Sequence, residues 1–196
     1  PYNIDFTKKA HAKMVQFYGD PGFSEKLGNC LTSISPEPEN SWNEVGADIW
    51  EDQFGVRWNR SVDKDIGVVC NCLISPDNIG EYQFPNPDDI SRYRGYDDIL
   101  KAKKDSFFVV NIGFSLFERA WTLAGMENLL MAMAADKRFA HSLFERILDF
   151  NLKIIENACS FDIDAMMFGD DWGQQTGLIM GPKLWEEFIK PRIKKM

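Results

Sequence analysis

The sequence has few cysteines and histidines, no cluster of basic residues and no long hydrophobic run. Its 196 residues include 4 cysteines and 2 histidines, too few for a secreted disulfide scaffold, so we expect reduced thiols and a cytoplasmic protein. The 30 acidic residues exceed the 22 basic ones and give a net charge of -8, which argues against a nucleic acid partner. No apolar run approaches the roughly 20 residues that span a bilayer, and the first residues have no signal-peptide core, so we expect no membrane partner.

The hydrophobic content is that of a folded protein. With 44% hydrophobic and 13% aromatic residues, the chain can bury a core, and we expect residues 1–196 to belong to one domain. The last segment, "GPKLWEEFIKPRIKKM", has a helix start signal at Pro182 but no stop signal, and Pro191 should bend this helix. Together with a first residue other than methionine, this pattern predicts that the chain is part of a larger domain.

The order of apolar patterns predicts an α/β fold with a parallel sheet or barrel. Alternating helical and extended patterns continue to the end of the chain, interrupted by a region rich in turn signals at about 45–87. We expect strands at 2–5, 106–113 and 165–169, helices at 6–18, 96–105, 114–134 (broken at Gly125), 136–159 and from 182, and an inserted hairpin with strands within 53–62 and 66–74.

Polar residues directly follow the predicted strand at 165–169. In a parallel barrel the loops after the strands form the active-site face, which would bring together Asp5, Asn111, Asp170, Asp171, Trp172, Gln174 and Gln175. Neighbouring strand residues point to opposite faces, so one aspartate would face the site. The alternative is that one aspartate caps a helix or turn while the other is solvated. Glu118 is a candidate proton donor or anchor, and the alternative is an exposed ion pair with Arg119.

Three segments resemble the uroporphyrinogen decarboxylase superfamily: "FGDDWGQQTGLIMGPKLWEEFIKPRIKKM", "FERAWTLAGMENLLMAM" and "DIWEDQFGVRWNRS". The resemblance covers most of the chain and is strongest from about residue 107 to the end. It implies a (β/α)₈ TIM barrel of which this chain is the N-terminal half, a partial barrel with an inserted β-hairpin region and with residues 1–5 as the first strand. The superfamily contains the haem-pathway decarboxylase and methyltransferases that act with corrinoid proteins or thiols.

Two departures from the decarboxylase pattern favour the methyltransferase branch. The decarboxylases hold their carboxylated substrate with an arginine-rich loop, whereas the corresponding stretch here, "DFTKKAHAKM", has no arginine. They also use an aspartate in a Phe-Ser-Asp-Ile-Leu motif. The nearest stretch here, "GADIWED", keeps only Asp48 and Ile49 of it, and the resemblance would give Asp48 a substrate-binding role.

The resemblance also bears on cofactors. Methyltransferases of this branch often bind zinc through a His-x-Cys motif and a later cysteine. His11 and His141 lie on predicted helices outside any such motif, and Cys70 and Cys72 have no histidine beside them in the sequence, so we expect packed thiols and no metal ligands in this chain. Zinc, if used, would have its ligands outside it. A corrinoid would be carried by a partner protein, and a decarboxylase would need no cofactor.

We therefore predict an enzyme that transfers a methyl group from a small methylated or methoxylated compound to a corrinoid partner. Its predicted catalytic residues are Asp170, Asp171 and Glu118, and its predicted substrate-binding residues are Asp5, Asp48, Asn111, Trp172 and Gln174. The alternatives are decarboxylation of a porphyrinogen in haem biosynthesis and a non-catalytic ligand-binding or corrinoid-binding barrel. Because half a barrel leaves sheet edges uncovered, we also expect the isolated chain to self-associate.

Overall fold

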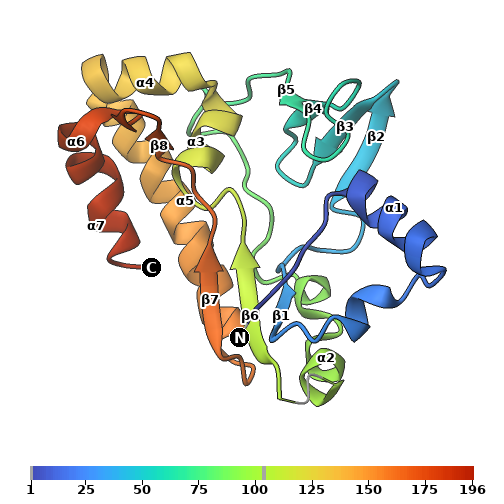
Figure 1. Cartoon of the computed structure of the whole chain (residues 1–196). Coiled ribbons are helices and arrows are strands. Elements are labelled where there is room, and N and C mark those ends of the chain that lie inside the picture. Colours follow the sequence, from blue (N-terminus) through green and yellow to red (C-terminus); the bar gives the residue numbers. More distant parts are fainter. Residues whose placement is uncertain (1, 103–104) are drawn as a thin grey trace.

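A three-stranded parallel sheet forms the centre of the molecule (Figure 1). The computed structural model describes residues 2–102 and 105–196. The strands are β1 (Leu31–Ile34), β6 (Phe107–Ile112) and β7 (Ala165–Phe168), and they lie side by side in chain order. Leu31 pairs with Phe107, and Asn111 pairs with Met167. The strands expected at 106–113 and 165–169 are therefore confirmed.

The two faces of this sheet differ in their cover. On one face, Phe108 and Val110 pack with Tyr96 of α2 (Tyr96–Ala102) and Ala158 of α5 (Lys137–Ala158). Side chains on the other face are largely exposed, with exposed fractions of 40% for Leu31, 49% for Phe107 and 48% for Met167. Strand partners in a parallel ladder point to the same side, so these three residues share one open face.

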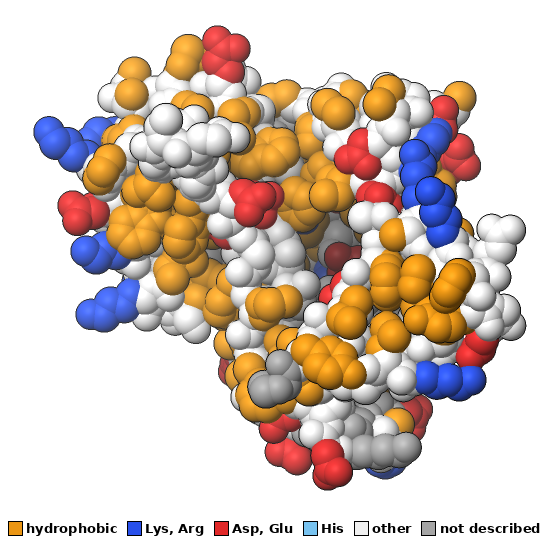
Figure 2. Space-filling model, in the orientation of Figure 1, with side chains coloured by type: hydrophobic (Ala, Val, Ile, Leu, Met, Phe, Trp, Pro, Cys, Tyr) orange, Lys and Arg blue, Asp and Glu red, His pale blue; other side chains and the backbone are white. Residues whose placement is uncertain are grey.

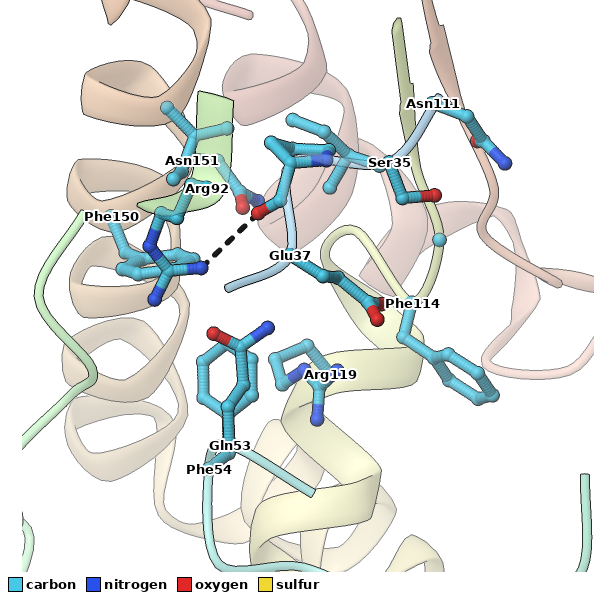
Figure 3. Close-up of a pocket in the computed structure, with 14 residues that line it drawn as sticks. Ser35, Glu37, Gln53, Phe54, Arg92, Asn111, Phe114, Arg119, Phe150 and Asn151 are labelled. Carbon is cyan, nitrogen blue, oxygen red and sulfur yellow. Dashed lines mark hydrogen bonds between the residues drawn. The ribbon is translucent and has the colours of Figure 1, made fainter. Parts of the chain in front are cut away.

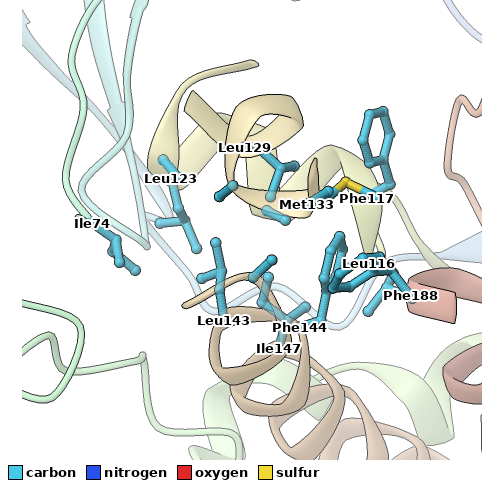
Figure 4. Close-up of a cluster of buried hydrophobic side chains, with 14 of the residues drawn as sticks. Ile74, Leu116, Phe117, Leu123, Leu129, Met133, Leu143, Phe144, Ile147 and Phe188 are labelled. Atoms are coloured by element: carbon cyan, nitrogen blue, oxygen red, sulfur yellow. The ribbon is translucent and has the colours of Figure 1, made fainter. Parts of the chain in front are cut away.

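The largest hydrophobic core lies among the helices that follow β6 (Figure 4). These are α3 (Phe117–Ala124), α4 (Met126–Ala135) and α5, with the C-terminal segments α6 (Gly181–Leu184), η3 (Trp185–Ile189) and α7 (Lys190–Ile193) packed against them. Gly125 has φ +85°, a conformation that favours glycine, and it separates α3 from α4 as expected. The Asp136 side chain accepts a hydrogen bond from the Phe139 N–H at 3.3 Å and caps α5, also as expected.

The bend expected at Pro191 takes the form of a π-helical turn. Proline lacks an N–H, so the ordinary bond to the Glu187 carbonyl cannot form. The preceding turn, η3, widens instead, and the Lys190 N–H donates to the Trp185 carbonyl five residues earlier. A widened turn is one of the known ways in which a helix accommodates such a break.

The region between β1 and α2 contains a four-stranded antiparallel sheet. Its strands, in spatial order, are β2 (Trp42–Gly46), β3 (Ile49–Asp52), β4 (Arg57–Asn59) and β5 (Val68–Val69). The predicted insertion is thus confirmed as antiparallel, and β4 and β5 fall within the two expected strands. The expectation of one hairpin is wrong, because β2 and β3 precede β4 and β5 in one continuous antiparallel sheet. A short hairpin of β8 (Gly173–Gln174) and β9 (Gly177–Leu178) follows β7.

The N-terminal segment differs from the prediction. Helix α1 (Lys8–Tyr18) matches the helix expected at 6–18, and the short η1 (Phe23–Lys26) follows it. Residues 2–5 form no strand, and Pro1 lies outside the described residues. The segment is held instead by isolated bonds, from the Cys30 N–H to the Tyr2 carbonyl at 3.0 Å and from the Ile4 N–H to Asn29 Oδ1 at 2.9 Å. The first strand of the parallel sheet is β1.

Candidate functional site

A pocket lies at the carboxyl ends of β1 and β6. The residues directly after these strands, Ser35 to Glu37 and Gly113 to Phe114, form one wall, and residues from the β3–β4 turn form the opposite wall. The pocket has two adjoining compartments with volumes of about 40 Å³ and about 160 Å³. Figure 2 shows that the surface is hollowed between the helical side of the molecule and the antiparallel sheet. Carboxyl ends of parallel strands are where α/β folds commonly place ligands.

Asp52 builds the turn that closes the pocket. Its Oδ1 accepts hydrogen bonds from the N–H groups of Phe54 at 2.9 Å and Val56 at 3.0 Å. Its Oδ2 accepts the Trp58 indole N–H at 3.4 Å and pairs with Arg119 Nη1 at 3.0 Å. The side chains of Asp52 and Arg119 are only 4% and 11% exposed. This buried ion pair fastens the antiparallel sheet to the first turn of α3.

The pocket wall combines charged side chains with a buried amide oxygen that accepts no hydrogen bond from a described residue. Arg92 is buried and donates to the carbonyls of Asn86 at 2.8 Å and Pro36 at 3.1 Å, and its burial lowers the pKa of the guanidinium. Figure 3 shows Gln53 rising from the β3–β4 turn toward the space between Arg92 and Glu37. The Oε1 atom of Gln53 is buried, and no described residue hydrogen-bonds to it.

Asp170, which follows β7, caps α3 across a gap of more than 50 residues in the chain. Its two carboxylate oxygens accept the N–H groups of Phe117 at 2.9 Å and Glu118 at 2.7 Å, and Trp172 Nε1 also donates to it. Burial raises the pKa of Asp170, and these hydrogen bonds oppose that rise. The sequence left open the alternative that one aspartate caps a helix or turn while the other is solvated. That alternative is confirmed, because Asp170 caps α3 and Asp171 is exposed.

Glu118 has the most perturbed carboxyl group near this cap. Its side chain is half-buried, and burial raises its pKa to about 7, with the negative charges of Asp171 and Asp170 adding to the rise. The expected alternative, an exposed ion pair between Glu118 and Arg119, is wrong because Arg119 is buried and pairs with Asp52. A carboxyl group with a pKa near 7 can both give and take a proton at neutral pH. Glu118 does not line the pocket, which Arg119 borders from the next position of the helix.

The structure assembles part of the predicted site. Asp170, Asp171, Glu118 and Trp172 lie together, and Asn111 lines the pocket. Trp172 packs edge-on against Trp185, with ring centroids 5.7 Å apart, so it supports Asp170. Gln174 is exposed on the β8–β9 hairpin.

Two predicted substrate-binding residues lie elsewhere. Asp5 follows no strand, is exposed, and accepts a hydrogen bond from Asn3 at 3.1 Å. Asp48 occupies the β2–β3 turn with φ +57° and pairs with Lys64 at 2.8 Å on the surface. Short polar residues such as Asp are tolerated at positive φ in turns, which accounts for Asp48 without a ligand. Neither residue borders the pocket.

Sequence reasoning missed most of the pocket wall. Ser35 and Glu37 were not expected there because β1, with the sequence "LTSI", is too short and polar to be recognised as a buried strand. Gln53 was missed because residues 53–62 were expected to form a strand, whereas Gln53 lies in the turn between β3 and β4. Once β1 is known, the segment "SPE" directly after it becomes a strand-end loop, which is the signal that would have identified Glu37.

The residues present do not form a zinc site. In the part of the chain that the structure describes, no group of three or more His, Cys, Asp or Glu side chains is placed to hold a metal ion. Cys70 and Cys72 have free thiols and are exposed, so the expectation that they pack together inside the protein is wrong. His11 and His141 pack against Phe23 and Phe188, with centroid distances of 5.3 Å and 4.4 Å, as expected for packing residues.

The fold and the pocket define a mixed α/β protein with a small pocket at the carboxyl ends of parallel strands. None of the helices in residues 2–102 and 105–196 is long and apolar enough to cross a membrane. No protein-family model, no curated protein and no solved structure matches this chain.

Proposed function

We propose that the chain is part of a barrel enzyme of the uroporphyrinogen decarboxylase superfamily that removes a methyl group from a small methylated or methoxylated compound and passes it to a corrinoid partner. The observation that carries this proposal is Glu118, a carboxyl group with a pKa of about 7 that lies beside the carboxyl ends of β6 and β7. When a methyl–oxygen bond breaks, the departing oxygen takes the bonding electron pair and needs a proton, which Glu118 supplies.

The order of the parallel strands supports a barrel. In an open doubly wound sheet the strand order reverses at a switch point, and ligands bind there. Here β1, β6 and β7 lie side by side in chain order, with helices between successive strands. Consecutive βα units of a (β/α)₈ barrel have this order, and in such a barrel the pocket would lie on the active-site face.

The pocket favours a small substrate over a porphyrinogen. Its compartments measure about 40 Å³ and 160 Å³, whereas pockets for drug-sized ligands hold about 300–1,000 Å³. A tetrapyrrole with several carboxylates would also need unpaired cations. Arg119 is paired with Asp52, and Arg92 donates to two backbone carbonyls. Decarboxylation of such a substrate therefore has less support.

Within the proposal, each acidic residue has a separate role. Asp170 orients the first turn of α3 through its two backbone bonds, and the negative charge of Asp171 adds to the effect of burial in raising the pKa of Glu118. A bound molecule would have to extend from the pocket past this turn to reach Glu118. The corrinoid would accept the methyl group, and zinc, if used, would have its ligands outside this chain.

The test is product analysis with purified protein, a reduced cobalamin as acceptor and 2-methoxyphenol as methyl donor. We expect formation of the methylated acceptor, and about a hundredfold slower turnover in Glu118→Gln, because general acid catalysis contributes about 10²–10⁴-fold. Glu127→Gln, an exposed glutamate in the first turn of α4, is the matched control and should turn over normally. Equal turnover of Glu118→Gln and the wild type would refute the role of Glu118, and CO₂ release from a porphyrinogen without methyl transfer would favour the decarboxylase.

A further inference from the structure

We propose that the pocket selects a small, uncharged, planar molecule that carries an O–H or N–H donor, and that Gln53 is its specificity-determining residue. The inference deepens the proposed function, on which it rests for the fate of the bound molecule. The recognition itself follows from three properties of the pocket wall: its charge, its aromatic rings and the unpartnered amide.

The charges of the wall are balanced within the protein. Two guanidinium groups, Arg92 and Arg119, face two carboxylates, Glu37 and Asp52. Asp52 and Arg119 form the buried ion pair. Burial lowers the pKa of Arg92, and the charges of Tyr93, Asp89 and, to a smaller extent, the exposed Glu37 oppose that effect. The four charges of the wall sum to zero, so a charged ligand would lose its hydration without entering a pocket of net opposite charge, which is costly in a partly buried site. An uncharged ligand avoids that cost.

Aromatic rings line the pocket from two sides. Trp42 and Trp58, with ring centroids 5.9 Å apart, come from the antiparallel sheet. Phe114 comes from the segment after β6, and its ring lies edge-on to Trp58 at a centroid distance of 5.2 Å. Phe114 has φ +50°, a strained conformation for a bulky residue that is found mainly at functional sites. Rings placed in this way favour contact with another planar ring.

Gln53 supplies the polar contact that the protein itself leaves unmade. Among the described residues, five buried side-chain atoms have no hydrogen-bond partner, and Gln53 Oε1 is the only one whose residue lines the pocket. A buried acceptor without a donor costs about 1–3 kcal/mol. A ligand that donates an O–H or N–H to this atom recovers that energy, and the amide N–H₂ offers donors to a ligand oxygen.

The experiment measures binding of phenol by isothermal titration calorimetry, without corrinoid or methyl donor. Three comparison compounds separate the requirements: cyclohexanol keeps the hydroxyl but is not planar, benzoate is an anion and benzylammonium is a cation. We expect phenol to bind at least fivefold more tightly than each of them. Tighter binding of benzoate or benzylammonium, or no measurable binding of phenol, would overturn the inference.

Two variants test Gln53 directly. Gln53→Leu keeps the size of the side chain and removes the amide, so its affinity for phenol should fall about tenfold, as expected for one lost hydrogen bond. Gln83→Leu is the matched control, since Gln83 is exposed and does not line the pocket. If Gln53→Leu does not fold, Gln53→Asn keeps an amide but shortens its reach and should also weaken binding. Unchanged affinity in the folded variant would overturn the role of Gln53. Binding of phenol without methyl transfer would support the inference about the pocket and would contradict only the proposed function.

Discussion

The Asp170 carboxylate takes the place of a side-chain cap at the amino end of α3. The residue at the N-cap position, Leu116, has no side chain that can accept a hydrogen bond, and Asp170 accepts two of the free N–H groups instead. We expect Asp170→Ala to lower the free energy of unfolding by about 2 kcal/mol, the upper range for a lost cap. The control Asp171→Ala removes an exposed carboxylate and should change it by less than about 0.5 kcal/mol. Urea denaturation measures both, and equal losses would contradict the capping role.

Glu118 makes the stability of the protein depend on pH. In the folded chain it keeps its proton up to a pKa of about 7, compared with 4.5 for the unperturbed group. Between these values the folded state holds more protons than the unfolded state, so the free energy of unfolding falls as the pH rises from about 4.5 to about 7. The variant Glu118→Gln has no carboxyl group at this position, so its free energy of unfolding should not show this fall.

The variant Glu118→Gln should therefore be more stable than the wild type at pH 8, by about 1 kcal/mol after allowance for solvent screening of a half-exposed group. Near pH 4 the two proteins should be equally stable. Urea denaturation at both pH values gives the comparison. A difference that is the same at pH 4 and pH 8 would show that Glu118 has an ordinary pKa.

Among the elements, the contact between the β3–β4 turn and α3 determines the shape of the pocket. The Asp52–Arg119 ion pair joins them. Removal of Arg119 and removal of Asp52 leave different sets of hydrogen bonds in place. Without Arg119, Asp52 still accepts two backbone N–H groups and the Trp58 indole. Without Asp52, these donors and the buried guanidinium all lose their acceptor.

We therefore expect Asp52→Leu to cost about 4 kcal/mol of unfolding free energy, within the range for breaking a buried pair. Arg119→Met should cost about 2 kcal/mol, because most of the hydrogen bonds to Asp52 survive. Chemical denaturation of both variants tests this order. A larger loss in Arg119→Met would mean that the turn is not built around Asp52.

The sequence predicts the long elements well and the short ones poorly. Helix α5 and strand β6 have strong periodicity or a continuous apolar run, and Gly125 and Asp136 mark helix ends by their own chemistry. Strand β1 has only four residues, of which two are polar, so its strand character depends on pairing with β6. The pocket depends on β1 and on the β3–β4 turn, which explains why Glu37 and Gln53 were missed while the residues after β6 and β7 were found.

At the scale of the whole molecule, the parallel sheet has an open apolar face and two free edges. Leu31, Phe107 and Met167 lie exposed on that face, and β1 and β7 are edge strands. Exposed apolar faces and unpaired edges favour association between chains. We expect the 196-residue chain to self-associate, as measured by sedimentation velocity.

A matched pair of substitutions tests whether the open face of the parallel sheet forms the contact between associating chains. Met167→Lys places a charge on the open face and should shift the chain toward monomer, whereas Met131→Lys changes a methionine of similar exposure on α4 and should have no effect. A wild-type chain that is monomeric and unfolds cooperatively would contradict the prediction.

In the proposed reaction Glu118 donates a proton to the departing oxygen, and the pH dependence of demethylation is the most direct test of this role. We expect wild-type turnover of 2-methoxyphenol to fall as the pH rises above about 7, the pKa of Glu118. Burial is the main cause of that raised pKa and the Asp171 charge is the next, so Asp171→Asn should move the fall to lower pH. Turnover that stays constant from pH 6 to pH 9, or an unchanged profile in Asp171→Asn, would contradict the account.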